Sequence, residues 1–386
     1  MFIAISSVLM GLTALYVVAR AVYPLACPAW LRWCLALAVF AAAEKILILR
    51  YTLGPTVVQL DLAPALVFGT GFAQGFVVLA ALLILTRDAV LLTLWLTRRL
   101  RQSKQPPSPP TLPLWRRPAP VLLLALLCTG WGVWEASKVP EVHKVRLKMP
   151  TLAEKAPALT GLHIAQLADL HIGAGFDRAW LAAVVARTNA LKPDMVVITG
   201  DIVDGSVDRL RASVAPLQDL RSRYGTFLVV GNHEYMSNVH AWIQEFQRMG
   251  ITVLTNSHVV VPVQGTPLVV AGVTDPRASV TGDTPPNPVQ ALQGRPAPAF
   301  TLMLSHQART AKASAAAGAQ LQLSGHTHGG LIWPLRAFVA LFNEGFVAGS
   351  YTVGGMRLYV HSGSALWAGF PLRLGVPSEI ADITLE

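Results

Sequence analysis

The chain has 386 residues, of which 53% are hydrophobic and only 13% are charged, and its mean hydropathy is +0.48. A soluble globular protein carries about a quarter charged residues, so this composition excludes a chain that is soluble throughout. The net charge of +10 comes from residues 1–150, which hold 15 basic and 5 acidic residues, because residues 151–386 hold 16 of each. This excess lies beside apolar segments, so we interpret it as membrane topology and expect no nucleic-acid partner.

Four apolar segments come first in the chain: approximately residues 2–19, 29–49, 62–85 and 120–134. A membrane-spanning helix needs about 20 apolar residues, so the first, third and fourth are predicted spans. The second is weaker, because Arg32 lies near its start and Glu44 and Lys45 lie near its end. We interpret the first as a span rather than a cleaved signal peptide, since no basic residue precedes it. Residues 1–137 are therefore predicted to form an all-α transmembrane region of about four helices.

Gly71 and Gly75 lie four residues apart in the third segment. This spacing lets another segment approach the helix closely. We expect the two glycines to pack within the helical region, with a dimer contact as the alternative, and the oligomeric state stays open.

The loop after the third segment is strongly basic. Residues 98–104 and 116–117 contain six basic residues and no acidic residue, which is typical of a cytoplasmic loop. Binding of anionic lipid or nucleic acid is the alternative use of such a run. The fourth segment then leads outward, which predicts a multi-pass protein of the cell membrane with residues 138–386 in the periplasm or otherwise outside the cytoplasm. Four basic residues on that side weigh against this orientation: Lys138, Lys144, Arg146 and Lys148.

After an expected linker over residues 138–150, short apolar runs alternate with helical patterns. Helices are expected at residues 179–191, 207–221, 239–249 and 308–317. Short strands are expected at residues 259–263, 268–271, 351–352 and 357–360. Residues 275–298, rich in Gly, Pro, Thr and Ala, are expected to form a long loop. The alternation predicts an α/β domain over residues 151–386.

Five further apolar runs have the length of buried strands, and each leads to polar residues that can bind a metal. The runs are residues 163–168, 195–199, 227–230, 300–304 and 321–324. They lead to Asp169 and His171, to Asp201, to Asn232, to His306, and to His326 and His328. Because ligands of α/β sheets bind at the carboxyl ends of strands, we expect these five ends to build one site.

The residue types at these ends suit a divalent metal such as Mn, Fe or Zn, because they offer carboxylates, imidazoles and an amide oxygen without cysteine. One tetrahedral metal takes three or four ligands, so seven candidates predict two metals that share a bridging ligand. A single Asp after a strand is often only a helix cap or a turn former. That alternative explains one strand end better than it explains five.

The motif set resembles the calcineurin-like metallophosphoesterases. It consists, in order, of Asp-x-His (169–171), Gly-Asp (200–201), Gly-Asn-His-Glu (231–234), a lone His306 and Gly-His-x-His (325–328). The stretch Ser-Gly-His-Thr-His-Gly-Gly, the preceding apolar region and the segment Pro377–Ile380 are most similar to the membrane-associated bacterial branch. Ala308 and Leu331 stand where many members have Pro and Gln, which puts the shape of the pocket in doubt but not the ligands.

The resemblance implies a four-layered sandwich of two mixed sheets flanked by helices. It also assigns the ligands to two metals bridged by Asp201: Asp169, His171 and His328 hold the first, and Asn232, His306 and His326 hold the second. Two such metals acidify a water for in-line attack on a phosphate. Asp201 and His233 are the implied catalytic residues, with His233 protonating the leaving oxygen or stabilising charge. Asn232 and His233 are the implied substrate-binding residues.

Two acidic residues near the motifs, Glu234 and Asp204, are weaker candidates for a role in the site. Glu234 is expected either to orient a ligand histidine or to cap the following helix, and Asp204 has no assigned role. The five histidines outside the motifs are expected to be structural or exposed: His143, His163, His240, His258 and His361.

Residues 331–342 are very apolar for a segment that directly follows the last ligand. They are expected to form a core helix. The alternative is an apolar lip that faces lipid, with Arg336 near a phosphate.

The expected function is a membrane-anchored, dinuclear-metal phosphoesterase that acts on a phosphate ester, with lipid-linked phosphates and pyrophosphates among the candidate substrates. One related branch cleaves the pyrophosphate of a UDP-diacylglucosamine in lipid A synthesis, and this alternative requires a cytoplasmic site. A non-catalytic membrane sensor on the same fold is the alternative of a different class. A sensor predicts a missing ligand, and all the family's ligand positions are filled.

Overall fold

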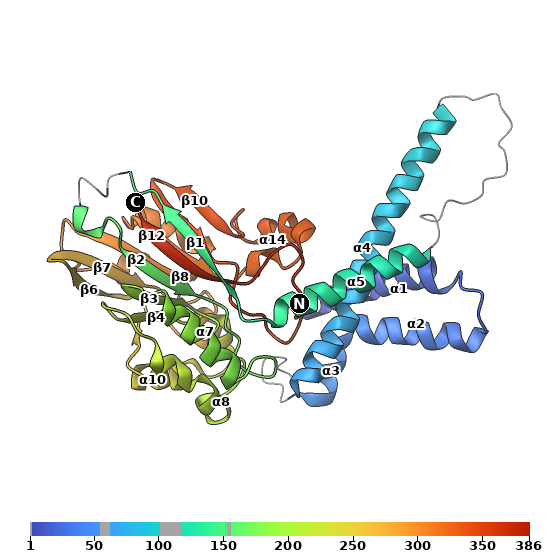
Figure 1. Cartoon of the computed structure of the whole chain (residues 1–386), viewed down its shortest axis with the longest axis horizontal. Helices are drawn as coiled ribbons and strands as arrows, with labels where there is room; N and C mark the ends of the chain where they lie inside the picture. The colour runs from blue at the N-terminus through green and yellow to red at the C-terminus, as the bar shows by residue number, and fades with distance from the viewer. Residues whose placement is uncertain (1, 55–61, 101–117, 151, 153–155) are drawn as a thin grey trace. The chain divides into compact units, whose positions relative to one another are not determined.

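The computed structural model describes the chain except residues 1, 55–61, 101–117, 151 and 153–155 (Figure 1). The chain groups into two compact units. The helical unit comprises Met1–Val57, Ala65–Trp134 and Gly369–Leu372. The second unit comprises Val58–Pro64, Glu135–Ala368 and Arg373–Glu386, and it contains the strands of the described chain.

Apolar helices make up most of the helical unit. They are α1 (Phe2–Val17), extended by a π-helical turn η1 (Val18–Val22), then α2 (Ala29–Ala43), α3 (Lys45–Leu53), α4 (Pro64–Leu100) and α5 (Pro118–Ser137). Three stretches of the described residues are long and apolar enough to cross a membrane: Ile5–Val22, Pro64–Thr97 and Pro118–Ser137. They correspond to the first, third and fourth predicted spans. The rest of the basic loop after α4, residues 101–104 and 116–117, lies outside the described residues.

The second predicted span is broken at Glu44. The helix α2 has 15 residues and α3 has 9, so neither reaches the about 20 residues that a span needs. Glu44 lies between them with φ −87° and ψ 17°, outside the helical conformation. Its carboxylate accepts a hydrogen bond of 2.6 Å from the hydroxyl of Ser7 in α1. This acidic residue therefore divides the apolar run into two shorter helices.

Gly71 and Gly75 of α4 pack against a segment of the same compact unit. A Cβ atom at Gly71 would lie 2.3 Å from Cγ of Pro371, and one at Gly75 would lie 2.4 Å from Cδ1 of Leu372. Both distances are too short for any side chain larger than hydrogen. The two glycines thus serve packing within the chain, but mainly against residues 371 and 372 rather than between the helices as expected.

The second unit is built on two six-stranded mixed sheets. The first has the order β1-β12-β2-β3-β4-β5 and the second the order β10-β11-β9-β8-β7-β6. The strands of the first sheet are β1 (Glu141–Leu147), β2 (His163–Leu167), β3 (Met195–Thr199), β4 (Thr226–Val229), β5 (Thr252–Val253) and β12 (Glu379–Leu385). Those of the second are β6 (Ser257–Val263), β7 (Thr266–Gly272), β8 (Phe300–Gln307), β9 (Leu321–Gly325), β10 (Gly349–Val353) and β11 (Met356–Val360).

Most neighbouring strands are parallel. From β2 to β5 and from β7 through β8 and β9 to β11 every pair is parallel, which brings the carboxyl ends of these strands to one edge of each sheet. The strand β12 is parallel to β1 but antiparallel to β2, and the pairs β6–β7 and β10–β11 are antiparallel.

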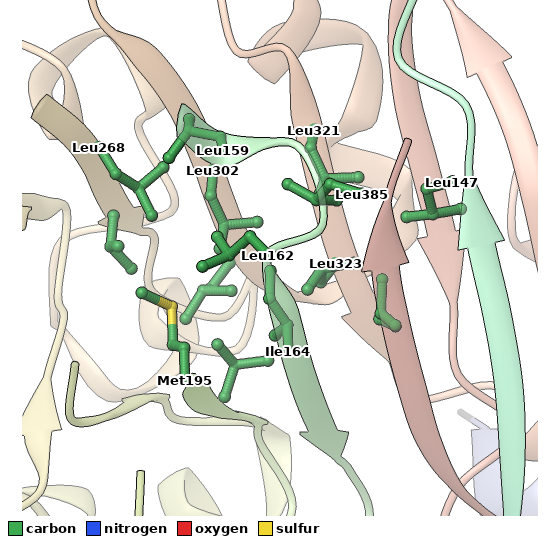
Figure 2. Close-up of a cluster of buried hydrophobic side chains, with 14 of the residues drawn as sticks. Leu147, Leu159, Leu162, Ile164, Met195, Leu268, Leu302, Leu321, Leu323 and Leu385 are labelled. Carbon is green, nitrogen blue, oxygen red and sulfur yellow. The ribbon is translucent and has the colours of Figure 1, made fainter. Parts of the chain in front are cut away.

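The two sheets share one hydrophobic core. Ile164 and Val197 of the first sheet belong to the same buried cluster as Leu302 of the second, and Figure 2 shows Ile164 and Leu302 within it. The other face of the second sheet forms a separate cluster in which Met303 packs with Ala311 of α13 (Ala311–Ala316). The helices α7, α8 and α10 cover the first sheet (Figure 1). The predicted sandwich of two mixed sheets flanked by helices is confirmed.

The helices beside the first sheet begin and end for local reasons. The helix α7 (Arg178–Ala190) begins where the side chain of Asp177 accepts a hydrogen bond from the backbone NH of Trp180, a normal N-cap. The expected helix over residues 207–221 is shorter, because α8 (Val207–Val214) gives way to a 3₁₀ turn that contains Pro216. Proline lacks the NH that would continue an α-helix. The helix α10 (Val239–Arg248) matches its predicted range closely.

Two stretches expected to be irregular contain regular structure. Residues 141–147, within the expected linker, form β1 and pair with β12 in parallel. The sequence does not predict this strand because only Val145 and Leu147 are buried and most of its other residues are exposed. The expected loop over residues 275–298 contains two one-turn helices, α11 (Ala278–Thr281) and α12 (Pro288–Ala291).

The apolar segment after the last predicted ligand is exposed. It forms a 3₁₀ turn, η8 (Trp333–Leu335), and the helix α14 (Arg336–Phe342), and neither contains a buried residue. The expectation of a core helix is therefore wrong. The segment is exposed and apolar, as the alternative of a lip requires; that it faces lipid stays a prediction.

Candidate metal centre

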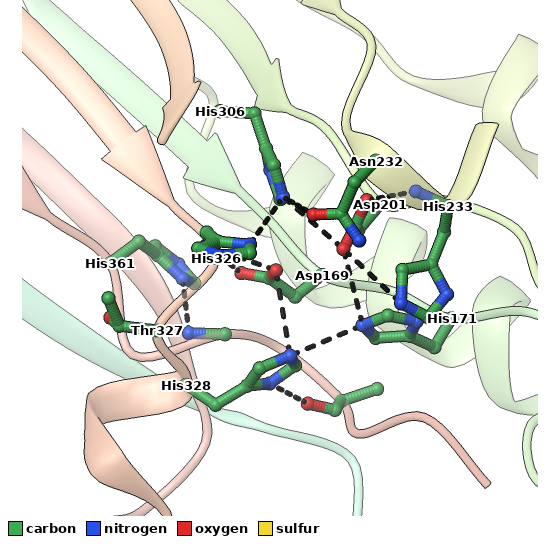
Figure 3. Close-up of polar contacts among 12 residues, drawn as sticks. Asp169, His171, Asp201, Asn232, His233, His306, His326, Thr327, His328 and His361 are labelled. Atoms are coloured by element: carbon green, nitrogen blue, oxygen red, sulfur yellow. Dashed lines mark hydrogen bonds and ion pairs between the residues drawn. The ribbon is translucent and has the colours of Figure 1, made fainter. Parts of the chain in front are cut away.

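The carboxyl ends of five strands meet at one place (Figure 3). Asp169 and His171 follow β2, Asp201 follows β3, and Asn232 follows β4. His306 lies at the end of β8, and His326 and His328 follow β9. The strand β8 continues through His306, and its register with β9 shifts between Leu304 and Gln307. An irregularity of this kind redirects a side chain. All seven predicted ligands are thus brought together by strands of both sheets.

Asp169, His171 and His328 form the first ligand cluster, in which the candidate ligand atoms lie within 4.8 Å of one another. Nδ1 of His171 lies 3.0 Å from the carboxylate of Asp204, and Nδ1 of His328 lies 3.2 Å from the carbonyl of Ala365. Both partners accept hydrogen bonds, so an imidazole that binds a metal through Nε2 would carry its proton on Nδ1 in either residue. The two Nε2 atoms, 3.3 Å apart, then face each other with lone pairs. A cation between them would relieve this repulsion.

Asp201, His306 and His326 form the second cluster, again within 4.8 Å. Nδ1 of His306 donates to the carbonyl of Thr199 at 2.8 Å, which leaves a lone pair on Nε2 of the neutral ring. That Nε2 lies 3.1 Å from His326, 3.2 Å from Oδ1 of Asn232 and 3.2 Å from Oδ2 of Asp201. Burial lowers the pKa of His306, but the charge of Asp201 outweighs it and holds the pKa well above its usual value, so Nε2 carries a proton when no metal takes that proton's place. So many acceptors around one point fit a bound cation.

The side chain of Asp201 lies between the two clusters. Its Oδ2 is 3.2 Å from Nε2 of His306 and 4.0 Å from Nε2 of His171. Burial raises the pKa of Asp201, but the charges of His306 and His233 outweigh it and hold the pKa well below the usual value. The group is therefore ionised, as a carboxylate shared by two metals must be.

Backbone strain is concentrated on the same residues. Five of the seven predicted ligands have positive φ angles: Asp169 (55°), His171 (44°), Asp201 (53°), His326 (76°) and His328 (49°). Such conformations cost about 1–3 kcal/mol each outside glycine and cluster at functional sites. A residue that caps the N-terminus of a helix normally has an extended backbone, so the positive φ angles at these strand ends favour a functional site over helix capping.

Two glycines leave room for the carboxylates. A Cβ atom at Gly231 would lie 2.3 Å from Oδ1 of Asp201, and one at Gly325 would lie 2.7 Å from Oδ2 of Asp169. Any larger residue at either position would displace the carboxylate beside it. The glycines of the Gly-Asn-His-Glu and Gly-His-x-His motifs are therefore steric requirements of the site.

Asp204 is a stronger site residue than its sequence context suggested. It is buried, and its Oδ1 lies 3.0 Å from Nδ1 of His171 and 2.6 Å from Nδ1 of His233. Burial raises the pKa of Asp204, but the charges of the two histidines outweigh it and lower the pKa to about 2. An ionised carboxylate in this place fixes the orientation of both rings.

Glu234 does not orient a ligand histidine. Its carboxylate accepts hydrogen bonds from the backbone NH groups of Gly231, Asp201, Ile202 and Val203 at 2.6–3.1 Å. The first of these caps α9 (Asn232–Met236), so Glu234 is a capping residue, but of the helix that contains it and not of the following helix. The other three fix the loop that carries Asp201.

His233 lies beside the two clusters, and only its Nδ1 contacts Asp204. Its Nε2 is 3.8 Å from Oδ2 of Asp201, and its backbone NH donates to Oδ1 of Asp201 at 2.8 Å. Burial lowers the pKa of His233, but Asp201 and Asp204 outweigh it and raise the pKa to about 9. Its Nε2, together with His171 and Asp201, forms a third group with metal-ligand spacing, so distance alone does not separate it from the ligands.

Two residues beside the site carry no signal in the sequence. The half-buried ring of Trp367 lies with its centroid 5.1 Å from that of His328 and 6.2 Å from that of His171. Arg373 is fully buried, and its guanidinium donates to the carbonyls of Gly363 at 3.1 Å and Ala365 at 2.9 Å. Neither belongs to a motif, and both lie in an irregular stretch before β12.

The five histidines outside the motifs lie outside the two clusters and have other partners. His143 lies 2.8 Å from Glu379, His163 contacts Asp382, His240 lies 3.0 Å from Asp283, His258 bonds the carbonyl of Ala291, and buried His361 accepts from the NH of Gly363.

Comparison with known proteins agrees with this geometry. Residues 162–330 match the family described as calcineurin-like phosphoesterase. A transmembrane protein with metallophosphoesterase domain of Bos taurus is 34% identical over 282 residues, which are 70% of this chain and 62% of that protein. A metallophosphoesterase of Campylobacter jejuni is 31% identical over 268 residues, which are 69% of this chain and 68% of that protein.

The chain therefore spans less than two thirds of the length of the bovine relative. Among solved structures, the calcineurin-like phosphoesterase YfkN of Bacillus subtilis is 15% identical, with a TM-score of 0.37 over 53% of this chain and 82% of that chain. Taken together with the match over residues 162–330, the relative that is 31% identical over 68% of its length shows that this chain belongs to the calcineurin-like metallophosphoesterase family.

Proposed function

We propose that this protein is a membrane-anchored phosphoesterase that uses two divalent metal ions, of Mn, Fe or Zn, to hydrolyse phosphate ester or pyrophosphate bonds. The observation that carries the proposal is the position of Asp201: it belongs to the second cluster, with Oδ2 3.2 Å from Nε2 of His306, and the same oxygen lies 4.0 Å from Nε2 of His171 in the first. One carboxylate within reach of two clusters supports a dinuclear site, since two metals about 3.5–4 Å apart share a bridging ligand.

The first metal would be held by Asp169, His171 and His328, the second by Asn232, His306 and His326, and Asp201 would bridge them. When bound, the metals would supply positive charge to the phosphate oxygens and acidify a water. Burial, with the charge of His171 next, holds the pKa of His328 well below its usual value, so this ligand is neutral as metal binding requires.

The remaining chemistry belongs to the side chains. Asp204 holds the proton of His233 on Nδ1, and with its pKa raised to about 9 His233 also carries a proton on Nε2 near neutral pH. Nε2 can then donate that proton to the leaving oxygen. Asn232, with Oδ1 directed at His306, keeps its amide NH₂ to donate to a phosphate oxygen.

We propose that residues 1–137 form the membrane region and residues 151–386 the catalytic domain, to which the connecting residues 138–150 add β1. Three helices with the length and composition of spans support anchoring in the cell membrane. The multi-pass arrangement, and a catalytic domain in the periplasm or outside the cell, rest on the basic loop after α4.

The test uses the purified full-length chain. After chelation it should be inactive, and addition of Mn²⁺, Zn²⁺ or Fe²⁺ should restore hydrolysis of at least one member of a panel of phosphomonoesters, phosphodiesters, nucleotide pyrophosphates and phospholipids. Asp169→Asn should abolish the restored activity, whereas Asp219→Asn, at an exposed position far from the motifs in sequence, should not. A folded protein that binds metal but hydrolyses nothing on the panel would favour the non-catalytic sensor.

A further inference from the structure

One short segment holds most of the exposed large apolar side chains of the second unit. Trp333 is 67% exposed, Phe338 55%, Leu341 78% and Phe342 67%. Among the described residues of this unit, the other large hydrophobic side chains with comparable exposure are single valines on three separate elements: Val260, Val280 and Val289. We call the segment from Trp333 to Phe342 the apolar lip.

The lip turns its apolar face outward. Its exposed positions are residues 333, 334, 337, 338, 341 and 342, which recur with the spacing of one helix face. All six are apolar, whereas a surface helix normally directs its polar face to solvent. The single charged side chain, Arg336, is only partly exposed and donates to the carbonyl of Ala348 at 3.3 Å. The orientation is therefore the reverse of that expected for a helix surrounded by water.

The lip is held close to the metal centre. It begins five residues after His328, and the intervening Ile332 is fully buried. A Cβ atom at Gly330 would lie 2.8 Å from Cγ of Arg336, so the start of α14 packs directly on the turn that follows His328. The backbone NH of Trp333 also donates to the carbonyl of Leu374 at 2.9 Å. The outward direction of the apolar side chains is thus fixed by buried contacts on the other side.

We propose that the apolar lip inserts into the interfacial layer of a lipid bilayer and docks the catalytic domain on the membrane. Residues 333–342 are too few to span a bilayer but have the composition of a helix that lies in its surface. Tryptophan prefers that layer. Residues 331–343 contain no acidic residue, so nothing in the segment repels anionic headgroups.

A bilayer is favoured over a protein partner because the same chain carries its own membrane helices. Three stretches of the described residues are long and apolar enough to cross a membrane, and the main part of the second unit, Glu135–Ala368, begins within the last of them. A domain tethered in this way is always near lipid, so the lip needs little added affinity to dock. This inference rests on the proposed membrane anchoring and is independent of the proposed hydrolysis. Docking would present the metal centre to phosphates at the membrane surface.

The test places a fluorescent label on the lip of the full-length chain in nanodiscs. The three native cysteines, Cys27, Cys34 and Cys128, are first changed to serine, and the environment-sensitive NBD group is attached to Leu341→Cys. Val289→Cys is the matched control, because Val289 is 72% exposed and Leu341 is 78% exposed. The discs contain phosphatidylcholine and phosphatidylglycerol, with or without lipids that carry a nitroxide on the acyl chain.

The label at position 341 should emit at shorter wavelength and be quenched by nitroxide lipid at least threefold more strongly than the label at position 289. Equal quenching at the two positions, or emission at position 341 typical of water, would overturn the proposal. Adding Phe338→Ser to the Leu341→Cys chain should weaken the quenching, whereas adding Val280→Ser should not. The experiment does not measure hydrolysis, so its result can be interpreted even if the protein has no phosphoesterase activity. If the Leu341→Cys protein misfolds, the label is attached to Phe342→Cys instead.

Discussion

Nδ1 of His233 lies 2.6 Å from Oδ1 of Asp204, and the same oxygen lies 3.0 Å from Nδ1 of His171. One buried carboxylate thus orients a proposed metal ligand and the proposed proton donor. We expect Asp204→Ala to lower metal affinity and kcat/KM by about 10–100-fold, the usual cost of removing a partner that orients a ligand. Metal titration and steady-state kinetics measure the two effects. The exposed Asp208, on α8, gives the control Asp208→Asn, and equal behaviour of the two variants would contradict the role.

Asp201 is the residue on which both clusters depend. Asp201→Asn removes the charge of the proposed bridge, so the purified protein should lose metal from both sites, not from one. Elemental analysis should give about two metals per chain for the parent protein and for Asp219→Asn, and fewer than one for Asp201→Asn. An unchanged metal content in a folded Asp201→Asn protein would remove Asp201 from the ligand set.

The role of His233 can be separated from metal binding by the choice of leaving group. His233→Ala should retain both metals but lose about 10²–10⁴-fold in rate if His233 is a general acid. The loss should be smaller for nitrophenyl esters, because their leaving groups need little protonation. The exposed His240 supplies the control His240→Ala. Equal losses for good and poor leaving groups would leave His233 with charge stabilisation alone.

The site was predictable because each ligand directly follows an apolar run, so its position depends on local sequence and on the parallel order of the strands. Asp169, Asp201 and His306 are of this kind. The role of Asp204 could not be predicted, because its partners, His171 and His233, lie 33 and 29 residues away in the chain. Trp367 gave no signal, since its proximity to His328 depends on an irregular loop that no periodicity describes.

The fold was predictable where burial and pattern coincide, as in the buried runs at β3 and β9. It was not predictable where they diverge. Hydrophobicity alone made residues 331–342 resemble a core helix, although α14 lies on the surface. The sequence correctly makes the second apolar segment a weaker candidate for a membrane span. Its division at Glu44, however, depends on a hydrogen bond with Ser7 that sequence cannot show.

A pH-dependent contribution to stability comes from His143 on β1 and Glu379 on β12, whose side chains are 2.8 Å apart. The hydrogen bond with Glu379 raises the pKa of His143. Its contribution is therefore fully present below the unfolded-state pKa of about 6.5 and is lost as pH rises through the higher folded-state pKa. His143→Gln should lower the melting temperature at pH 6 and have little effect at pH 9.

The contribution of Glu379 to stability depends on pH in the opposite direction, because its pKa is lowered in the folded state. Burial raises the pKa of Glu379, but His361 and His143 outweigh it and lower the pKa to about 2, so its contribution is lost as pH falls from about 4.5 towards 2. Thermal unfolding of the parent protein and of His143→Gln, followed from about pH 2 to about pH 9, tests both. A melting-temperature difference that grows from pH 6 to pH 9 would contradict the assignment.

The side of the membrane on which the metal centre lies can be tested with reporters fused after Glu386. With the basic loop after α4 in the cytoplasm, alkaline phosphatase should be active and green fluorescent protein should be dark. The opposite pattern would place the domain in the cytoplasm. A cytoplasmic domain would make the nucleotide-linked lipid pyrophosphate the favoured substrate class.

The strand β12 separates β1 from β2 in the first sheet, yet it comes after every other element in the chain. The ribosome therefore delivers the apolar helices, β1 and all the strands that carry the candidate ligands before it delivers β12. Until residue 385 has emerged, β1 has no partner among the described strands, and the outer edge of β2 stays open. The first sheet can therefore be completed only after β12 has emerged. A truncation that removes Glu379–Leu385 should therefore leave a first sheet in which β1 is not joined to β2.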